Sequence, residues 1–277
     1  MKKNFVFVFI IISLVSCNNK QSQVNDNSVD TITIAADTTT LIEKDTDDIA
    51  NIELDEEYIQ NFSYKGINIF EPRVYESTDF TKQLLHIMQP LAGLFHKGNK
   101  YELKECKIVK NNVYEDECSG STMLEPTLDT KGNCLYLIKG LKSFDKNVLD
   151  TVPANIKVWL NKTHSFTFNN TGYQFRSEGK LISKNGSGDE YYENIRDYKL
   201  YLSTGDKTQC IVQMKYFADT MTEILFIGDL DKDGKPDLII SSPDHYESNR
   251  LLLFLSSYAG SNEIVKLVSI TADSFAC

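Results

Sequence analysis

Short apolar segments separated by turn residues recur through most of the chain, and this pattern limits the fold more than any other sequence feature. The segments are rich in aromatic and β-branched residues, which favour strands. Phe166 and Tyr173 flank an Asn-Asn-Thr-Gly turn with the alternation of a hairpin that buries one face. The predicted strands are Tyr101–Val109, Cys134–Leu141, Ile156–Leu160, His164–Phe168, Tyr173–Ser177, Tyr198–Ser203, Gln209–Phe217 and the runs EILFIG, DLIIS, LLLFLS and IVKLVSI.

Only one segment has a helical pattern, STDFTKQLLHIMQPLAGLF. Ser77, Thr78 or Asp79 can cap it, and Pro90 ends or kinks it, which predicts one helix of about ten residues. No segment recurs as a second copy, which disfavours a full propeller of repeated blades. The sequence therefore predicts a mainly all-β fold, with antiparallel sandwich-like, barrel-like or propeller-fragment sheets and one short N-terminal helix.

The N-terminus has the features of a secretory signal. Lys2 and Lys3 precede the apolar run Phe5 to Val15, which is shorter than the roughly 20 residues that a membrane-spanning helix needs. The segment LVSC, ending at Cys17, resembles the bacterial lipobox. That resemblance implies a lipid on Cys17 that holds the protein to a membrane of the bacterial cell envelope, which we expect to be the outer membrane. The sequence does not indicate on which face of that membrane the protein lies.

Four parts of the chain follow from these signals. Polar residues without a sustained period predict a disordered tether after the signal. Apolar periodicity lapses near residues 142–155, which favours a boundary between two subdomains over one domain with a long loop. The predicted parts are a signal peptide (1–16), a tether (17–56), an N-terminal β-rich subdomain with the helix (57–150) and a C-terminal β subdomain (151–277).

The chain is acidic, with a formal net charge of −10 that becomes −12 when the signal and its two lysines are removed. Such a surface repels nucleic acid and anionic head groups, so neither is an expected partner. Cations are favoured instead.

Five cysteines remain once Cys17 carries lipid, so at most two disulfides can form. Cys106 and Cys118 flank a predicted turn at Asn111-Asn112 and are a candidate pair. A three-residue loop would bring the two cysteines together, whereas a two-residue loop would set Cys106 opposite Glu117.

The segment GDLDKDGKPDLII concentrates carboxylates ahead of an apolar strand. Aspartates at alternating positions with a glycine at the sharp turn suit a hard cation, and Ca²⁺ fits best because it takes six to eight oxygen ligands. Zinc would require nitrogen or sulfur ligands. The alternative is a polar turn without an ion. The candidate ligands are Asp229, Asp231, Asp233, Asp237 and the backbone carbonyl of Lys235.

The flanks of this loop exclude an EF-hand, which needs a glutamate at position twelve and helices on both sides. Position twelve is Ile240, and the flanking runs are strand-like. From Glu223 to Ser242 the chain instead resembles the FG-GAP and VCBS-type calcium loops of integrin-like propellers. The resemblance implies Ca²⁺ on the aspartates just named and on the Lys235 carbonyl. We expect a structural rather than a functional role for the ion. Such loops usually occur in series, and this chain has one.

No catalytic signature occurs in the sequence: G-x-S-x-G, H-E-x-x-H, C-x-x-C and a phosphate-binding glycine loop are all missing. Ser241 to Arg250 gathers polar residues on a predicted exposed turn, either a ligand-binding edge or a solvated connection. We therefore expect a non-enzymatic binding, adhesion or accessory module with a glycan or a surface protein as its ligand. The alternative is an envelope hydrolase, glycan- or peptide-directed, whose carboxylates come from separate strands.

Overall fold

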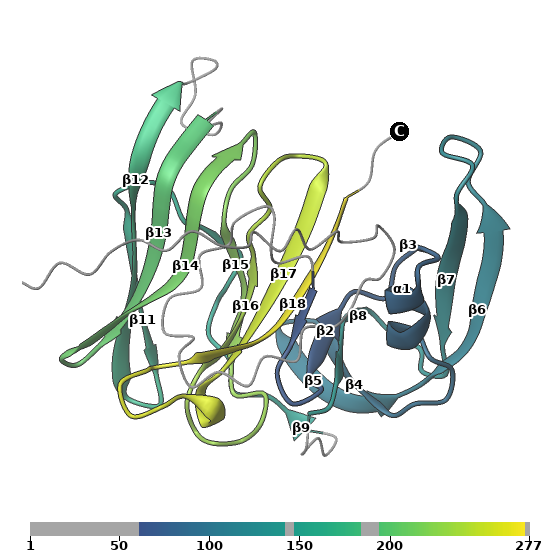
Figure 1. Cartoon of the computed structure of the whole chain (residues 1–277). Helices are drawn as coiled ribbons and strands as arrows, with labels where there is room; N and C mark the ends of the chain where they lie inside the picture. Colours follow the sequence, from purple (N-terminus) through teal and green to yellow (C-terminus); the bar gives the residue numbers. More distant parts are fainter. Residues whose placement is uncertain (1–60, 142–146, 184–193, 275–277) are drawn as a thin grey trace, which may run out of the picture. The chain divides into compact units, whose positions relative to one another are not determined.

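The computed structural model describes residues 61–141, 147–183 and 194–274 (Figure 1). All of these residues belong to one compact unit. Their strands form four antiparallel sheets, which confirms the predicted all-β class, and none of these sheets closes on itself within the described ranges. The signal, Cys17 and the tether lie outside the described residues.

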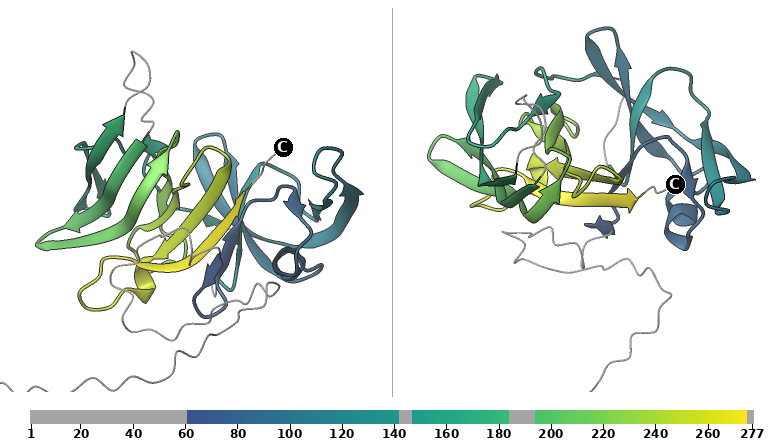
Figure 2. Two further views of the ribbon diagram at one scale, coloured as in Figure 1. Left: turned by 45° about the horizontal axis from the view of Figure 1, so that its top comes forward. Right: turned by 90° about the horizontal axis from the view of Figure 1, so that it is seen from above.

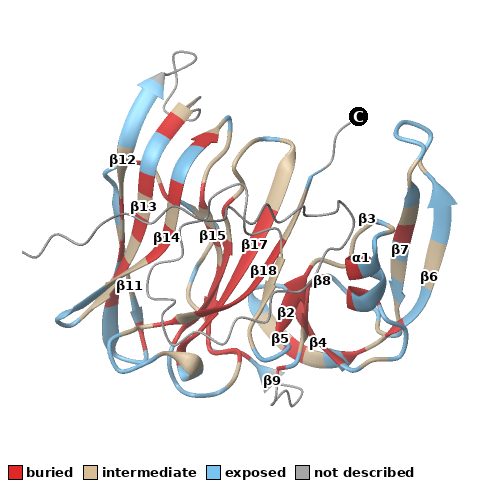
Figure 3. Cartoon of the chain, in the orientation of Figure 1, coloured by how far each residue is buried: buried red, intermediate tan, exposed pale blue. Residues whose placement is uncertain are grey.

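The central sheet has six strands in the order β1-β18-β17-β16-β15-β10. Both of its faces are buried: Leu238 and Ile240 pack into one core and Ile239 into another. This burial explains the uninterrupted apolar runs, because no residue of the strand has to face water. Figure 3 shows the buried stretch through β17 and β18. The strands are β1 (Asn61–Ser63), β10 (Ile156–Lys157), β15 (Glu223–Gly228), β16 (Asp237–Ser241), β17 (Ser248–Leu255) and β18 (Lys266–Ser274).

A four-stranded sheet, β11-β12-β13-β14, covers one face of the central sheet. The predicted β11–β12 hairpin forms, and in it Phe166 pairs with Tyr173, with the two rings stacked at 5.1 Å. Tyr198 and Phe175 are fully buried in the core between the two sheets. The strands are β11 (Thr163–Phe168), β12 (Thr171–Ser183), β13 (Asn194–Thr204) and β14 (Lys207–Ala218).

A five-stranded sheet, β2-β8-β4-β5-β9, packs on the other face of the central sheet through a second core. Ile69, Leu94 and Ile138 contribute to this core from the five-stranded sheet, and Leu253 contributes from the central sheet. The strands are β2 (Asn68–Phe70), β4 (Leu91–Lys97), β5 (Lys100–Cys106), β8 (Cys134–Lys139) and β9 (Asn147–Val148).

A third core lies where the helix α1 (Asp79–Leu84) and the sheet β3-β7-β6 meet the five-stranded sheet. Helix α1 has six residues rather than the predicted ten. Thr78 caps its start by accepting a hydrogen bond from the Thr81 N–H (3.1 Å), and the chain leaves the helix before Met88, which has a φ of 66°. The strands are β3 (Tyr75–Glu76), β6 (Ile108–Glu115) and β7 (Thr122–Leu128).

The predicted subdomain boundary near residue 150 stays a prediction. The five- and three-stranded sheets come from residues before it, and the four-stranded sheet from residues after it. The central sheet draws on both parts, because β1 pairs with β18 through Asn61 and Thr271. Figure 2 shows the sheets from two further directions.

The structure does not form the candidate disulfide between Cys106 and Cys118. Cys106 is a free, buried thiol at the end of β5, whereas Cys118 belongs to a different disulfide. The error comes from the turn: Asn111 and Asn112 lie inside β6, and β6 pairs with β7 instead of β5. Burial raises the pKa of the Cys106 thiol to about 12, so this residue is an inert part of the third core.

Candidate metal centre

The aspartate loop connects β15 to β16, two antiparallel strands whose register pairs Gly228 with Asp237. Two contacts, one from Asp229 and one from Leu230, fix the start of the loop. The Asp229 N–H donates to the carbonyl of Asp150 (3.1 Å), and the Leu230 side chain is buried in the second core. A strand–loop–strand arrangement therefore stands where the apolar flanks predicted it.

The Asp229 carboxylate closes the loop on itself. Its oxygens accept hydrogen bonds from the N–H groups of Asp233 (3.1 Å) and Gly234 (2.9 Å). Gly234 has a φ of 82° with nothing within 4 Å of where a Cβ would lie, so the glycine is needed for its backbone conformation rather than for space.

Three carboxylates converge inside this loop. Asp229, Asp231 and Asp237 each offer one oxygen, and these three atoms all lie within 4.8 Å of one another. Asp237 is fully buried and Asp229 is 9% exposed, so water cannot separate the charges fully. Three anions at this separation repel one another strongly in a partly desolvated site.

Asp237 is held by neutral donors on both oxygens. Oδ2 accepts the Leu230 N–H (2.7 Å), and Oδ1 accepts the Ser256 N–H (2.8 Å). Burial raises the pKa of Asp237 well above the usual aspartate value, and the charge of Asp231 raises it further. Asp237 is thus a fully buried carboxylate with no cationic partner among the described contacts.

Asp231 supplies the observation that most favours a bound cation. Its Oδ2 accepts the Ser257 hydroxyl, whereas its Oδ1 is buried and accepts no hydrogen bond from the described residues. Burial raises the pKa of Asp231, and the Asp233 and Asp229 charges act in the same direction. A buried carboxylate oxygen without a donor is costly unless a cation lies beside it.

The donor set suits calcium. The converging ligands are carboxylate oxygens, with serine hydroxyls beside them, and the described cluster contains no imidazole or thiolate. Hard oxygen donors favour Ca²⁺ or Mg²⁺ over zinc. The residues present therefore fit the calcium ion that the sequence predicted.

Asp233, one of the predicted ligands, does not belong to the group of three converging carboxylates. The Asp233 carboxylate lies 2.9 Å and 3.0 Å from the Ser256 hydroxyl and accepts the Lys235 N–H (2.8 Å); it is outside the group of three. The roles of Asp233 and of the Lys235 carbonyl as ligands stay predictions.

Ser256, Ser257 and Asn169 contribute to the centre and were not found from the sequence. The two serines belong to the 3₁₀ turn η1 (Ser256–Tyr258), which follows β17. Asn169, from the β11–β12 turn, donates to the carbonyl of Gly234 (2.9 Å) across 65 residues of sequence. Serine after an apolar strand and asparagine in a turn are too common to signal such contacts.

The Ser256 hydroxyl is shared between two carboxylates of the loop. It lies within 3.0 Å of Asp237 Oδ1 as well as of Asp233. Because a hydroxyl carries one proton, it satisfies only one of these carboxylates at a time.

The chain matches no protein-family model, no curated protein and no solved structure, so what this centre does follows from its own geometry.

Proposed function

We propose that this chain is a lipid-anchored protein of the bacterial cell envelope whose β-rich part is stabilised by one calcium ion and serves as a non-enzymatic binding module. The buried Asp231 Oδ1 without a donor, beside Asp229 and Asp237, carries the calcium assignment. The lipobox at Cys17 and the acidic surface support the anchor and the exclusion of nucleic acid. No described helix is long and apolar enough to cross a membrane.

Calcium at this position would act as a staple. The loop is attached to β15 and β16 by sequence, to η1 through Ser256 and Ser257, and to the β11–β12 turn through Asn169. An ion that binds the folded form stabilises all of these connections at once. Extracellular calcium modules typically have dissociation constants of about 10⁻⁴ to 10⁻³ M, which external calcium can saturate.

The alternative, a hydrolase, needs a carboxyl group with a raised pKa as its general acid. A cavity of about 350 Å³ lies between the β3–α1 segment and the strand ends at Ser248 and Ser274, and its wall includes Asp244, Arg250 and Asp273. Asp244 does not meet this requirement. Burial acts to raise its pKa, but the Ser248 hydroxyl and the Arg250 guanidinium outweigh burial and lower it. The carboxyl groups of Asp231 and Asp237 have a raised pKa, but they belong to the proposed calcium centre, so we favour a binding role for a glycan or a surface protein.

Thermal unfolding tests the calcium centre. The midpoint in about 10 mM calcium should exceed that in chelator by about 3 to 10 °C, because calcium at about 10- to 100-fold over the dissociation constant contributes about 1.4 to 2.7 kcal/mol. Magnesium should give a smaller shift, since it demands stricter octahedral geometry.

The variant Asp231→Asn distinguishes the loss of a calcium site from a general loss of stability. This change relieves repulsion among the carboxylates, so in chelator the variant should melt at or above the wild-type midpoint, while its calcium shift should largely disappear. Asp206→Asn, which makes the same change on an exposed hairpin turn, is the matched control and should keep the full shift. A wild-type midpoint that calcium does not move would refute the assignment.

A further inference from the structure

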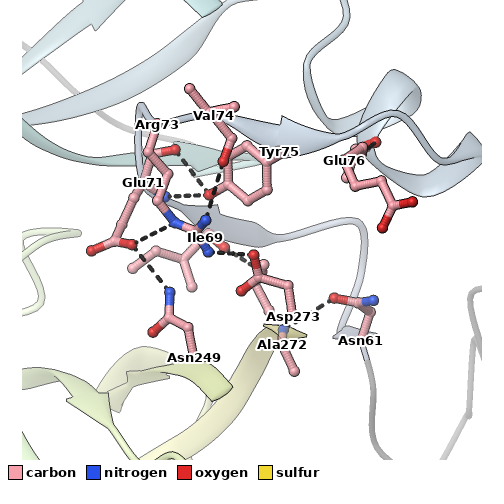
Figure 4. Close-up of polar contacts among 12 residues, drawn as sticks. Asn61, Ile69, Glu71, Arg73, Val74, Tyr75, Glu76, Asn249, Ala272 and Asp273 are labelled. Atoms are coloured by element: carbon pink, nitrogen blue, oxygen red, sulfur yellow. Dashed lines mark hydrogen bonds and ion pairs between the residues drawn. The ribbon is translucent and has the colours of Figure 1, made fainter. Parts of the chain in front are cut away.

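The sheet β3-β7-β6 joins the rest of the described chain through the third core and through β3, so β6 is its outer strand (Figure 1). Next to β3, Arg73 bonds to Asp273 of β18 and lies 4.4 Å from the centre of the Tyr75 ring (Figure 4). At the start of β6 the Ile108 carbonyl accepts the Met88 N–H (2.9 Å). Beyond that point, no strand of the described residues pairs with the outer side of β6. This open edge can be extended by another strand.

A hydrogen bond at the hairpin turn shows which backbone groups of β6 face outward. The Asp116 N–H donates to the Ser121 carbonyl (2.9 Å), so Asp116 faces β7. Backbone groups alternate in direction along a strand, so every second residue before Asp116 also faces β7. Pro126 agrees with this direction, because it has no N–H and lies opposite a residue that faces away. The outward-facing residues are Asn111, Val113 and Glu115, and none of their N–H or carbonyl groups bonds to a described residue outside the sheet.

Val113 lies in the middle of this open edge, and its side chain is 65% exposed. Its neighbour across the hairpin, Leu124, is buried in the third core, so the valine lacks cover on the side away from β7. Exposed edges are usually protected by charges or by a covering segment, since a β-branched side chain there favours pairing with another strand. The edge of β14 has such cover, because the Gln209 side chain accepts the N–H groups of Ile264 and Val265.

The charges of the β6–β7 hairpin favour one partner and one direction. Its base carries Lys107 and Lys110, and its tip carries Glu115, Asp116 and Glu117. An antiparallel second copy brings each acidic tip beside the basic base of the other copy. A parallel second copy brings the two acidic tips together, where they repel. The hairpin is therefore complementary to itself in the antiparallel direction.

We propose that β6 pairs with β6 of a second copy of this chain, antiparallel and centred on Val113. In this register all three outward-facing residues exchange hydrogen bonds with the partner strand, and Lys110 lies opposite the partner's Asp116. The two valine side chains meet at the two-fold axis. Because both copies use the same edge, the assembly closes as a dimer. The proposal goes beyond the binding function proposed above and uses none of the residues of the calcium centre.

Sedimentation of the full chain, in a density-matched detergent with micelles in large excess, tests for the dimer. We expect a monomer–dimer equilibrium with a dissociation constant below about 100 μM. Val113→Pro should weaken it about tenfold or more, because the lost N–H faces outward and the β6–β7 pairing does not use it. A wild-type chain that stays monomeric at about 100 μM would overturn the proposal and leave the edge to strands of other proteins.

Lys110→Glu tests the direction of pairing through a side chain alone. It should weaken the dimer about tenfold, because it places like charges opposite each other at both ends of the paired segment. Lys162→Glu makes the same charge change on an exposed residue outside this sheet and should keep most of the wild-type affinity. Since Lys110 is also exposed, its variant decides the matter if Val113→Pro does not fold. Equal dimerisation of the two lysine variants contradicts the antiparallel pairing.

Disulfide cross-linking tests the register. The Cα atoms of residues at the two-fold axis of a hydrogen-bonded pair are about 5.5 Å apart, which a disulfide can span. Val113→Cys should therefore give a covalent dimer with a copper–phenanthroline oxidant. Glu115→Cys should not, because its two copies would lie roughly 14 Å apart, and neither should the wild type with its own thiols. Cross-linking through Glu115→Cys, or through neither variant, is the result that rejects the proposed pair.

Discussion

The aspartate loop and the cavity wall both gather carboxylates, but they neutralise them differently. In the wall, Asp244 and Asp273 pair with the guanidinium groups of Arg250 and Arg73. In the loop, Asp237 is bonded by neutral N–H and O–H donors. The pKa shifts follow this difference: burial raises the pKa of Asp237, whereas Ser248 and Arg250 overcome burial and lower that of Asp244. Under the calcium proposal, the ion from solution supplies the positive charge that the guanidinium groups supply in the wall.

Among the variants that test this comparison, Asp237→Ala should lower the free energy of unfolding the most. Two buried N–H groups, from Leu230 and Ser256, would lose their acceptor, which should cost about 3 to 5 kcal/mol of unfolding free energy. Chemical denaturation measures this loss, and the calcium shift should vanish with it. A loss below about 1 kcal/mol would mean that the loop is solvated rather than packed.

Asp233→Ala is the informative companion, because the sequence predicted four aspartate ligands and the structure gathers three. If the three suffice, this variant keeps most of the calcium shift. A shift as small as that of Asp231→Asn would restore Asp233 to the ligand set.

Arg250→Met should have the next largest effect, because it leaves Asp244, whose side chain is 14% exposed, without its cation. We expect a loss of about 3 kcal/mol in denaturation experiments. Combining it with Asp244→Asn should recover part of that loss, and the calcium shift should stay intact throughout. Equal losses in the single and the double variant would show that packing of the arginine stem, not charge pairing, matters.

The smallest expected effect is a dependence on pH in chelator. Because the folded-state pKa of Asp231 is raised, the charged carboxylate destabilises the fold fully above that pKa, and the penalty is relieved as pH falls toward the unfolded value of about 3.9. The stability advantage of Asp231→Asn over the wild type should therefore be greatest near neutral pH and shrink on acidification. Melting midpoints across this range measure it, and an advantage that grows toward acid would contradict the sign.

The sequence predicted the loop because all of its aspartates lie within nine residues, so local spacing carries the information. The cavity wall could not be predicted, since Arg73 and Asp273 are 200 residues apart and are brought together by the β1–β18 pairing and by hydrogen bonds between β2 and β18. The Ser241–Arg250 turn was noticed for its polar residues, but its sequence does not reveal Arg73 as a neighbour of the same cavity.

The difference between local signals and contacts of distant residues also separates correct from incorrect fold predictions. The β11–β12 hairpin was predicted because the Asn-Asn-Thr-Gly turn and the alternating rings agree, and the structure supplies its register. Asn111 and Asn112 looked like a turn but lie in β6, where pairing with β7 overrides local preference. The helix ended early because the Met88 N–H bonds to the Ile108 carbonyl, a contact that no helical pattern contains.

The pairing of β1 with β18 also has a consequence for biosynthesis. Ile69 donates its N–H to the Ser269 hydroxyl (3.0 Å), 200 residues further along the chain, and β1 reaches the central sheet only through β18. A ribosome makes the first of these partners long before the second. The central sheet can therefore be completed only after nearly all of the described chain has been translated, and until then its apolar strands lack part of their native packing.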